Sequence, residues 1–436
     1  MQDLFLSTVA STSRGEPAQG NPGASKIVLK VTLLASEWRS CKGGLSTINR
    51  ELALQLAQHM QVEVTFLVPQ FACSEEERRF AKSHNITIRE AAERPGFDSL
   101  EWLCFAPRDL AIDVVLGHGA KLGKQAQVIR ESHNCKWVQV VHTAAEELGM
   151  HKNYSKAISK GEEKHRTEVE LCKLADVVLA VGPKLKEAYT AYLGSCKEHQ
   201  DVIQLTPGIF REFSGVRKTT EESRNFRVLT FGRGDPEDFS LKGYDIAVKA
   251  IVELKDSSYR LIFVGAPDGK EEDVAKNLLQ CGISKDQLVV RKFLPDKEGL
   301  KELFCEVDLV IMPSRTEGFG LTALEALSAG LPILVSGNSG FGDALRSLPT
   351  GKQFVVETAE PKTWAKTIAA VRLKDRPERQ QEILRLQASY ADTFSWEKQC
   401  EALIEKMWRI VYGKTFIGGV VCSLGPISIH FTRDIS

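Results

Sequence analysis

The chain alternates between two kinds of segment along most of its 436 residues. Short runs rich in Val, Ile, Leu and Phe are followed by longer stretches whose apolar residues recur at helical spacing. This alternation is typical of a parallel sheet covered by helices on both faces. Because the chain is longer than one hydrophobic core usually serves, we expect two doubly wound α/β domains in series.

The predicted strands form two series separated by a stretch without this rhythm. The first series is Val28–Ala35, Val62–Val68, Ile112–Leu116, Trp137–His142, Val177–Val181 and Val202–Leu205. The second is Arg227–Phe231, Leu261–Val264, Leu288–Phe293, Leu309–Met312, Ile333–Val335 and Phe354–Val356. We therefore predict a flexible leader (1–25), an N-terminal domain (26–212), a linker (213–225), a C-terminal domain (226–392), a closing amphipathic helix (393–412) and a tail without an assigned role (413–436).

The composition narrows the class of protein. Lys plus Arg and Asp plus Glu both total 57, so the net charge is zero, which argues against a nucleic-acid binder. Ten cysteines without a CxxC pair predict reduced thiols rather than a zinc site. The sequence has no apolar run of about 18 residues, and its first residues make a poor signal peptide. We expect a cytoplasmic protein without a transmembrane segment, and its oligomeric state stays open.

The most informative segment follows the predicted strand Leu309–Met312. It contains Glu317, Gly318, Phe319 and Gly320, and then opens a helix with Leu321 and Thr322 that carries Glu325. Open α/β sheets bind ligands at the carboxyl ends of their strands, and a helix N-terminus favours an anion there. Glycines let the backbone approach a ligand, and each carboxylate can accept hydrogen bonds from a sugar diol. The pattern predicts a site for a nucleotide diphosphate-sugar.

The same letters fit a second pattern, Gly318-x-Gly320-x-x-Ala323, which is the dinucleotide fingerprint of dehydrogenases. However, several residues separate the end of the strand from Gly318, whereas the fingerprint needs a tight turn. The next predicted strand runs into Ser336 and Gly337 without a clear acid for a ribose. The dehydrogenase interpretation therefore ranks below the nucleotide-sugar site.

The run E-G-F-G-L-T-A-L-E, followed by A-L-S-A-G-L-P-I, resembles the signature of retaining glycosyltransferase family 4. The likeness extends from about Lys26 to about Tyr412 and is strongest over 226–345. It implies the GT-B fold, in which two Rossmann-like domains face a cleft and a C-terminal helix crosses back. It also implies that Glu325 holds the ribose of the donor and that Glu317 contacts the transferred sugar.

The resemblance implies two cations against the donor diphosphate. These are Arg233, in Phe231-Gly232-Arg233, and Lys242, in Leu241-Lys242-Gly243. Fixed cations stabilise the charge that develops on a departing diphosphate, so no metal and no cofactor are expected. The spacing between the two residues is about three residues longer than is common in the family, and acidic residues lie between them.

Two further pieces in the first domain match the family. Gly43 and Gly44 precede a predicted helix and correspond to a glycine pair beside the diphosphate. His142, at the end of a predicted strand, corresponds to a histidine that touches the donor sugar. A lone histidine in such a place is otherwise most often a satisfied structural residue. Glu146 and Glu147 fit either an acceptor-facing position or a solvated helix start.

The sequence thus predicts a metal-independent transferase with an α-linked product and an unidentified acceptor. The catalytic candidates are Glu317, His142, Arg233 and Lys242. Two other classes stay open. One is a GT-B module that binds a nucleotide-sugar without turnover. The presence of all four charged donor residues, which are Arg233, Lys242, Glu317 and Glu325, disfavours this class. The other is a nucleotide-sugar epimerase or a phosphorylase, and the sequence offers no candidate for the pyridoxal lysine of a phosphorylase.

Overall fold

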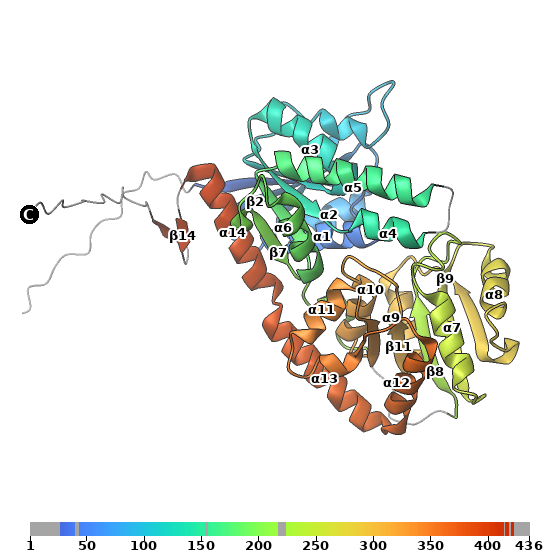
Figure 1. The fold of residues 1–436 in the computed structure, drawn as a ribbon. Helices are drawn as coiled ribbons and strands as arrows, with labels where there is room; N and C mark the ends of the chain where they lie inside the picture. Colours follow the sequence, from blue (N-terminus) through green and yellow to red (C-terminus); the bar gives the residue numbers. More distant parts are fainter. Residues whose placement is uncertain are drawn as a thin grey trace, which may run out of the picture.

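The computed structural model describes residues 27–39, 43–152, 156–216, 224–413, 415–417 and 420–422. The predicted leader therefore lies outside the described residues, as does most of the predicted linker. Within the described residues the chain forms two parallel sheets, each flanked by helices (Figure 1). The two-domain α/β prediction is confirmed, while the exact domain boundaries stay a prediction.

The N-terminal sheet has seven parallel strands in the order β3-β2-β1-β4-β5-β6-β7. They are β1 (Leu29–Leu34), β2 (Val62–Pro69), β3 (Ile86–Ala91), β4 (Val114–His118), β5 (Lys136–Val141), β6 (Val177–Val181) and β7 (Val202–Leu205). The helices between them are α1 (Gly44–Leu56), α2 (Glu75–Ser83), α3 (Gly119–His133), α4 (Ala145–His151), α5 (Ala157–Leu174) and α6 (Pro183–Leu193). The strand order reverses direction at β1 and β4, which is where ligands bind in doubly wound sheets.

The C-terminal sheet has six parallel strands in the order β10-β9-β8-β11-β12-β13. They are β8 (Phe226–Phe231), β9 (Tyr259–Ala266), β10 (Leu288–Lys292), β11 (Leu309–Met312), β12 (Ile333–Ser336) and β13 (Val355–Val356). Its helices are α7 (Tyr244–Glu253), α8 (Glu271–Leu279), α9 (Lys297–Glu306), α10 (Leu321–Ser328), α11 (Gly340–Arg346), α12 (Pro361–Leu373) and α13 (Arg376–Thr393). The reversal point of this sheet, between β8 and β11, carries the predicted donor residues on the segments that follow both strands.

The closing helix is confirmed as α14 (Trp396–Tyr412), which begins on the C-terminal domain and runs back to the N-terminal domain (Figure 1). Its buried residues recur at helical spacing, and Ser395 caps its first turn by accepting from the Lys398 N–H. Lys406 on this helix pairs with Asp201 of the N-terminal domain at 2.9 Å. The helix therefore connects the two domains.

Two features differ from the sequence-based expectation. Strand β3 was not predicted, because its sequence Ile-Thr-Ile-Arg-Glu-Ala mixes polar and apolar residues at the edge of the sheet, where only its two ends are buried. The second feature lies in the tail, for which the sequence predicts no role. The structure pairs β14 (Thr415–Ile417) antiparallel with β15 (Val420–Cys422).

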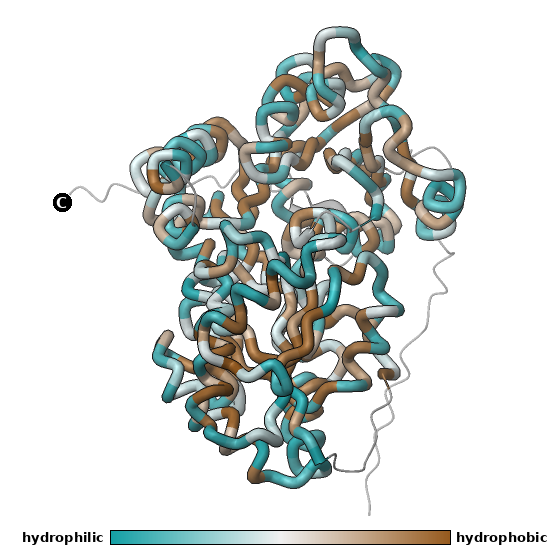
Figure 2. The backbone as a smooth tube through the Cα atoms, turned by 90° about the vertical axis from the view of Figure 1, so that its right-hand side faces the viewer, coloured by the Kyte–Doolittle hydropathy of each residue, from teal (hydrophilic) through white to brown (hydrophobic). Residues whose placement is uncertain are grey.

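The largest hydrophobic cluster extends from one domain into the other. It joins the N-terminal sheet around Phe66 to Phe319 and Phe341 of the C-terminal domain and to Trp408 of α14. Figure 2 shows the hydrophobic strands at the centre, surrounded by more hydrophilic outer segments. None of the helices within the described residues is long and apolar enough to cross a membrane. The shared cluster lies at the boundary between the two domains, where the predicted site also lies.

Candidate functional site

The centre of the site is the loop that joins β11 to α10, which we call the 313–320 loop. Glu317 in this loop is 7% exposed, and its side chain accepts hydrogen bonds from Lys242 at 2.5 Å and from the Ser314 hydroxyl at 3.0 Å. Its backbone N–H donates to the Asn338 carbonyl at 3.1 Å. The carboxylate is thus held from two sides before any ligand arrives.

Glycine at position 320 makes room for this carboxylate. Gly320 has a φ of 107°, which favours glycine, and it caps the first turn of α10. A Cβ at this position would stand 2.7 Å from Glu317 Oε2, which is closer than van der Waals contact allows. The glycine was predicted to admit a ligand, and in the structure it accommodates the glutamate that is predicted to contact the ligand.

The two predicted cations lie on the segment between β8 and α7, but in different surroundings. Lys242 contacts Glu317 directly and its side chain is 23% exposed. The longer spacing from Arg233 is therefore compatible with a place for Lys242 in the site. The Arg233 side chain is 72% exposed, with its Nε 3.9 Å from an oxygen of the buried Asp238. An exposed guanidinium beside the site is free to turn toward an anionic ligand.

Glu325 lies on α10, about one and a half turns beyond Gly320, and is partly buried. Burial raises the pKa of Glu325 to about 7, and the charge of Lys297 at the start of α9 acts in the opposite direction. Lys297 is the charged group that acts on the Glu325 carboxyl, whereas Lys242 contacts Glu317.

The N-terminal domain contributes His142, directly after β5, and its neighbour His118 at the end of β4. His118 Nδ1 lies 2.9 Å from His142 Nε2, and the two rings are stacked with centroids 5.1 Å apart. Burial lowers the pKa of His142 to about 3, aided by the charge of Lys164, and burial with the neighbouring ring lowers the pKa of His118 well below its usual value. Both imidazoles are therefore neutral at physiological pH, so one ring nitrogen donates and the other accepts.

Two residues behind His142 were missed by the sequence analysis. Glu168 on α5 is 1% exposed, and burial raises its pKa to about 7, although Lys164 and a hydrogen bond with Tyr189 oppose the shift. The Tyr189 hydroxyl also lies 3.2 Å from the Thr143 carbonyl and donates to it. A signal existed in the sequence, because Glu168 occupies the buried face of α5 together with Gly161 and Cys172.

The predicted glycines bring the two domains into contact. A Cβ on Gly318 would stand 2.2 Å from the His142 carbonyl oxygen, and a Cβ on Gly44 would stand 2.9 Å from the Leu321 side chain. Gly182, which precedes α6, likewise leaves room for the ring of Phe319, which is 4% exposed. Phe319 and Leu321 therefore contact the opposite domain.

Two remaining donor-site predictions receive no such contact. Gly43 is exposed and has a φ of 107°, with nothing within 4 Å of a Cβ built on it. Thr322 is partly buried in the first turn of α10. Their roles toward a donor stay predictions. Among the described residues, no group of three or more His, Cys, Asp or Glu side chains is arranged to hold a metal ion.

The sequence is similar to those of known proteins. Residues 32–403 match the family described as family 4 glycosyltransferase in conflict systems. The D-inositol 3-phosphate glycosyltransferase of Corynebacterium urealyticum is 26% identical over 68% of this chain and 71% of its own length. The protein of the same name from Rhodococcus opacus is 31% identical over 47% of this chain and 45% of its own length. Both relatives are named as glycosyltransferases.

Solved structures share the fold at low sequence identity. Sucrose-phosphate synthase from Thermosynechococcus elongatus superposes with a TM-score of 0.65 and 18% identity, over 88% of this chain and 99% of that chain. The Anabaena protein HepE, in complex with UDP and glucose, gives a TM-score of 0.64 and 17% identity over 87% and 99% of the two chains. Both are consistent with a GT-B arrangement of the two sheets. The chain therefore belongs to the family 4 glycosyltransferases and is a hexosyltransferase-type enzyme with the GT-B fold.

Proposed function

We propose that the enzyme transfers a sugar from a nucleotide diphosphate-sugar to an acceptor with retention of configuration, giving an α-linked product, and that it needs no metal. The observation that carries the proposal is the contact between Lys242 and Glu317 at the carboxyl end of β11, directly before the N-terminus of α10. It sets a cation, a carboxylate and a helix N-terminus side by side, which are the groups that a sugar diphosphate requires.

The diphosphate would be held by Lys242, Arg233 and the first N–H groups of α10. An ammonium group has three N–H donors, so Lys242 can keep its bond to Glu317 while it donates to a phosphate oxygen. When the bond between sugar and phosphate breaks, negative charge grows on the phosphate, and cations held beside it lower the barrier. This is the role that a divalent metal has in other transferases, which is why we propose that the metal is dispensable.

The sugar would face the N-terminal domain. Its hydroxyls would bond to Glu317 and to the His142 side chain, which is neutral and whose Nδ1 is not the atom that contacts His118. The acceptor would attack from the face that the phosphate leaves, and a phosphate oxygen would take the acceptor's proton. This route needs no carboxylate nucleophile, in contrast to glycosidases with paired acids. The HepE complexes with UDP and UDP-glucose support a nucleotide-sugar donor.

The test is to incubate the protein, treated with EDTA, with UDP-glucose, GDP-mannose and ADP-glucose and to measure free nucleotide by chromatography. We expect one nucleotide to be released, and an α-linked product by NMR when a compatible acceptor is supplied. Release that disappears with EDTA contradicts metal independence, and a β-linked product contradicts retention. Tight binding without release would instead support a binding module, and a changed donor sugar would support an epimerase.

A further inference from the structure

Lys184 makes a polar contact across the domain boundary. It stands in the first turn of α6 in the N-terminal domain, and its side chain is 14% exposed. Its ammonium lies 2.7 Å from each of three oxygens, which belong to Glu147, Thr316 and Asn338. An ammonium has three N–H donors, so all three are used. Glu147 belongs to the same domain as Lys184, whereas Thr316 and Asn338 belong to the other.

The two partners of Lys184 in the C-terminal domain hold Glu317. Thr316 directly precedes Glu317 and is 2% exposed. The Asn338 carbonyl accepts the Glu317 N–H at 3.1 Å, and the Asn338 side-chain amide donates to the Arg315 carbonyl at 2.7 Å. Asn338 therefore hydrogen-bonds to the backbone on both sides of Thr316. Lys184 donates to the side chains of both Asn338 and Thr316.

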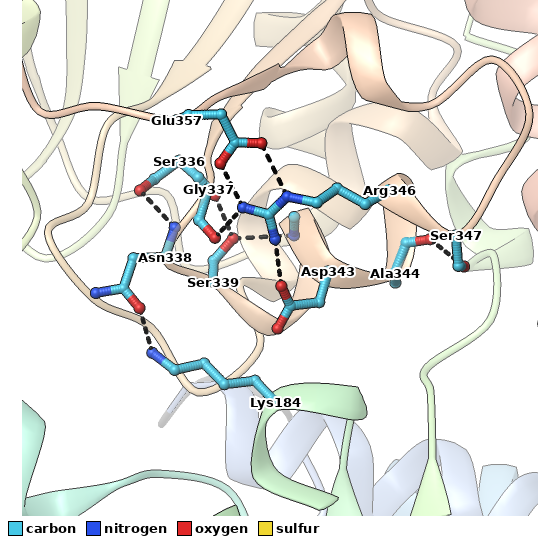
Figure 3. A network of polar contacts seen from close by, with 11 residues as sticks. Lys184, Ser336, Gly337, Asn338, Ser339, Asp343, Ala344, Arg346, Ser347 and Glu357 are labelled. Carbon is cyan, nitrogen blue, oxygen red and sulfur yellow. Dashed lines mark hydrogen bonds and ion pairs between the residues drawn. The ribbon is translucent and has the colours of Figure 1, made fainter. Parts of the chain in front are cut away.

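The turn that carries Asn338 is anchored from behind. Arg346 on α11 donates to the Gly337 carbonyl at 2.6 Å and pairs with Glu357 at the same distance (Figure 3). Figure 3 shows Lys184 approaching Asn338 from the opposite side. Because one side of the turn is fixed within the C-terminal domain, the contact that depends on the other domain is the one from Lys184.

Glu147 completes the contact from the N-terminal domain. Besides Lys184, it accepts a hydrogen bond from the Thr316 hydroxyl at 2.6 Å. Burial alone would raise the pKa of Glu147, but the hydrogen bonds from Lys184 and Thr316 outweigh it, and the pKa lies below its usual value. Glu147 is thus a charged member of an interdomain contact. The sequence analysis left open an acceptor-facing side chain or a solvated helix start for Glu147, and the structure adds this interdomain contact.

We propose that Lys184 is a positioning residue that couples the approach of the two domains to the placement of Glu317. When the domains separate, Lys184 and Glu147 keep each other, while Thr316 and Asn338 lose their partners from the opposite domain. When the domains meet, the 313–320 loop is fixed at Thr316 and Asn338, and Glu317 is set against Lys242. The inference rests on the proposed function for its kinetic consequence, but the structural coupling stands independently of it.

The kinetic test compares Lys184→Met, Lys184→Arg and Thr316→Val with the wild type, using whichever of UDP-glucose, GDP-mannose and ADP-glucose is turned over. Misplacement of a reacting group by a fraction of an ångström costs turnover more than binding. We expect kcat of Lys184→Met to fall about 10- to 100-fold with the donor KM changed less than about threefold, and Lys184→Arg to recover most of the loss. Lys173→Met is the matched control, because Lys173 pairs with Glu170 at the same 2.7 Å within α5.

A double-mutant cycle tests whether Lys184 acts through Thr316. The effect of combining Lys184→Met with Thr316→Val should be close to the larger single effect, because both changes break the same contact. Effects that multiply would overturn the proposal, as would a wild-type kcat in Lys184→Met. Thr316→Val adds no charge and keeps the side-chain shape, so it remains informative if Lys184→Met folds poorly.

Small-angle scattering of the ligand-free proteins separates this inference from the proposed function. Lys184→Met should shift the scattering toward a more open particle, while Lys173→Met should match the wild type. If the wild type turns over no nucleotide-sugar, the proposed function fails and scattering alone decides the inference. Identical curves for the wild type and Lys184→Met would then overturn it.

Discussion

Two groups of side chains at the domain boundary, one around the 313–320 loop and one around His142, differ in charge. On the C-terminal side, the groups beside the 313–320 loop are charged and paired: Lys242 with Glu317 at 2.5 Å, and Arg315 with Asp245 at 2.8 Å. On the N-terminal side, the histidine pair is held neutral by burial, and burial raises the pKa of Glu168 behind it to about 7. One side is suited to bind an anion, and the other to contact uncharged sugar hydroxyls.

Burial is the cause of this difference. The C-terminal groups lie on loops at strand ends, where Lys242 and Arg233 keep contact with solvent. On the N-terminal side, His118 at the end of β4 and Glu168 on α5 are both almost fully buried. Ionised groups in such a place lose most of their hydration, so their neutral forms are favoured. The predictions below test each half of this comparison.

The largest effect is expected on the charged side, from Glu317→Gln. This change keeps the shape but removes the charge that holds Lys242, so the cation is no longer fixed where phosphate charge develops. We expect the single-turnover rate at saturating donor to fall about 10²- to 10³-fold, or roughly 3–4 kcal/mol. The control is Glu298→Gln, because Glu298 pairs with Lys301 on an exposed helix face and is 79% exposed. A wild-type rate for Glu317→Gln would show that the pair is structural only.

The next largest effect is a pH dependence of the free energy of unfolding, which is caused by Glu168 on the N-terminal side. The Glu168 pKa is about 7 in the folded protein and about 4.5 when the chain unfolds, so the unfolded state loses its proton first as pH rises. The free energy of unfolding should therefore fall between about pH 4.5 and pH 7, by at most about 3 kcal/mol from this residue, and stay low above pH 7.

Urea denaturation of Glu168→Gln across this pH range is the measurement. The variant cannot ionise, so its curve should fall less than that of the wild type, and the difference should be largest above pH 7. Because the pKa of Glu325 is also raised to about 7, only the difference between the two proteins reports on Glu168. Parallel curves would mean that Glu168 is ionised in the folded protein, and the neutral side of the comparison would be wrong.

The smallest effect concerns Glu325, which is separate from both groups. Glu325→Ala should weaken nucleotide binding by roughly 1–3 kcal/mol, as expected for a lost hydrogen bond to a charged group. Since the pKa of Glu325 is about 7, the wild type should bind the nucleotide more weakly at pH 6 than at pH 8, because the protonated acid is a poorer acceptor. Calorimetry at both pH values should show this change in the wild type and not in Glu325→Ala.

The sequence predicts the parts of the molecule that depend on local pattern. All the predicted strands appear in the two sheets, because buried parallel strands are continuous apolar runs. Residues 313–326 likewise predict the loop and helix that bring Glu317 next to Lys242, whose position was the less certain of the two cations. Local signals fail for β3, where edge residues are half exposed and the apolar pattern is weak.

The contacts of Lys184, Glu147 and Tyr189 could not be predicted in this way. Lys184 meets Thr316, which is 132 residues away along the chain, and it does so only because the two domains meet at this particular place. A lysine at a helix start is most often solvated, and no local pattern separates this one from the others. Such contacts depend on the packing of whole domains, which a single sequence does not reveal.

The bare α-carbon of Gly318 sets how closely the two halves of the enzyme can approach. Its missing methyl group would stand 2.2 Å from the carbonyl oxygen of His142, so an alanine there would act as a wedge and force a gap of roughly 1 Å. An alanine at position 44 would meet the end of the Leu321 side chain at 2.9 Å, so it would separate the two domains less. Alanine variants at these two positions would let crystallographers determine structures with the domains further apart, without the removal of any charged residue.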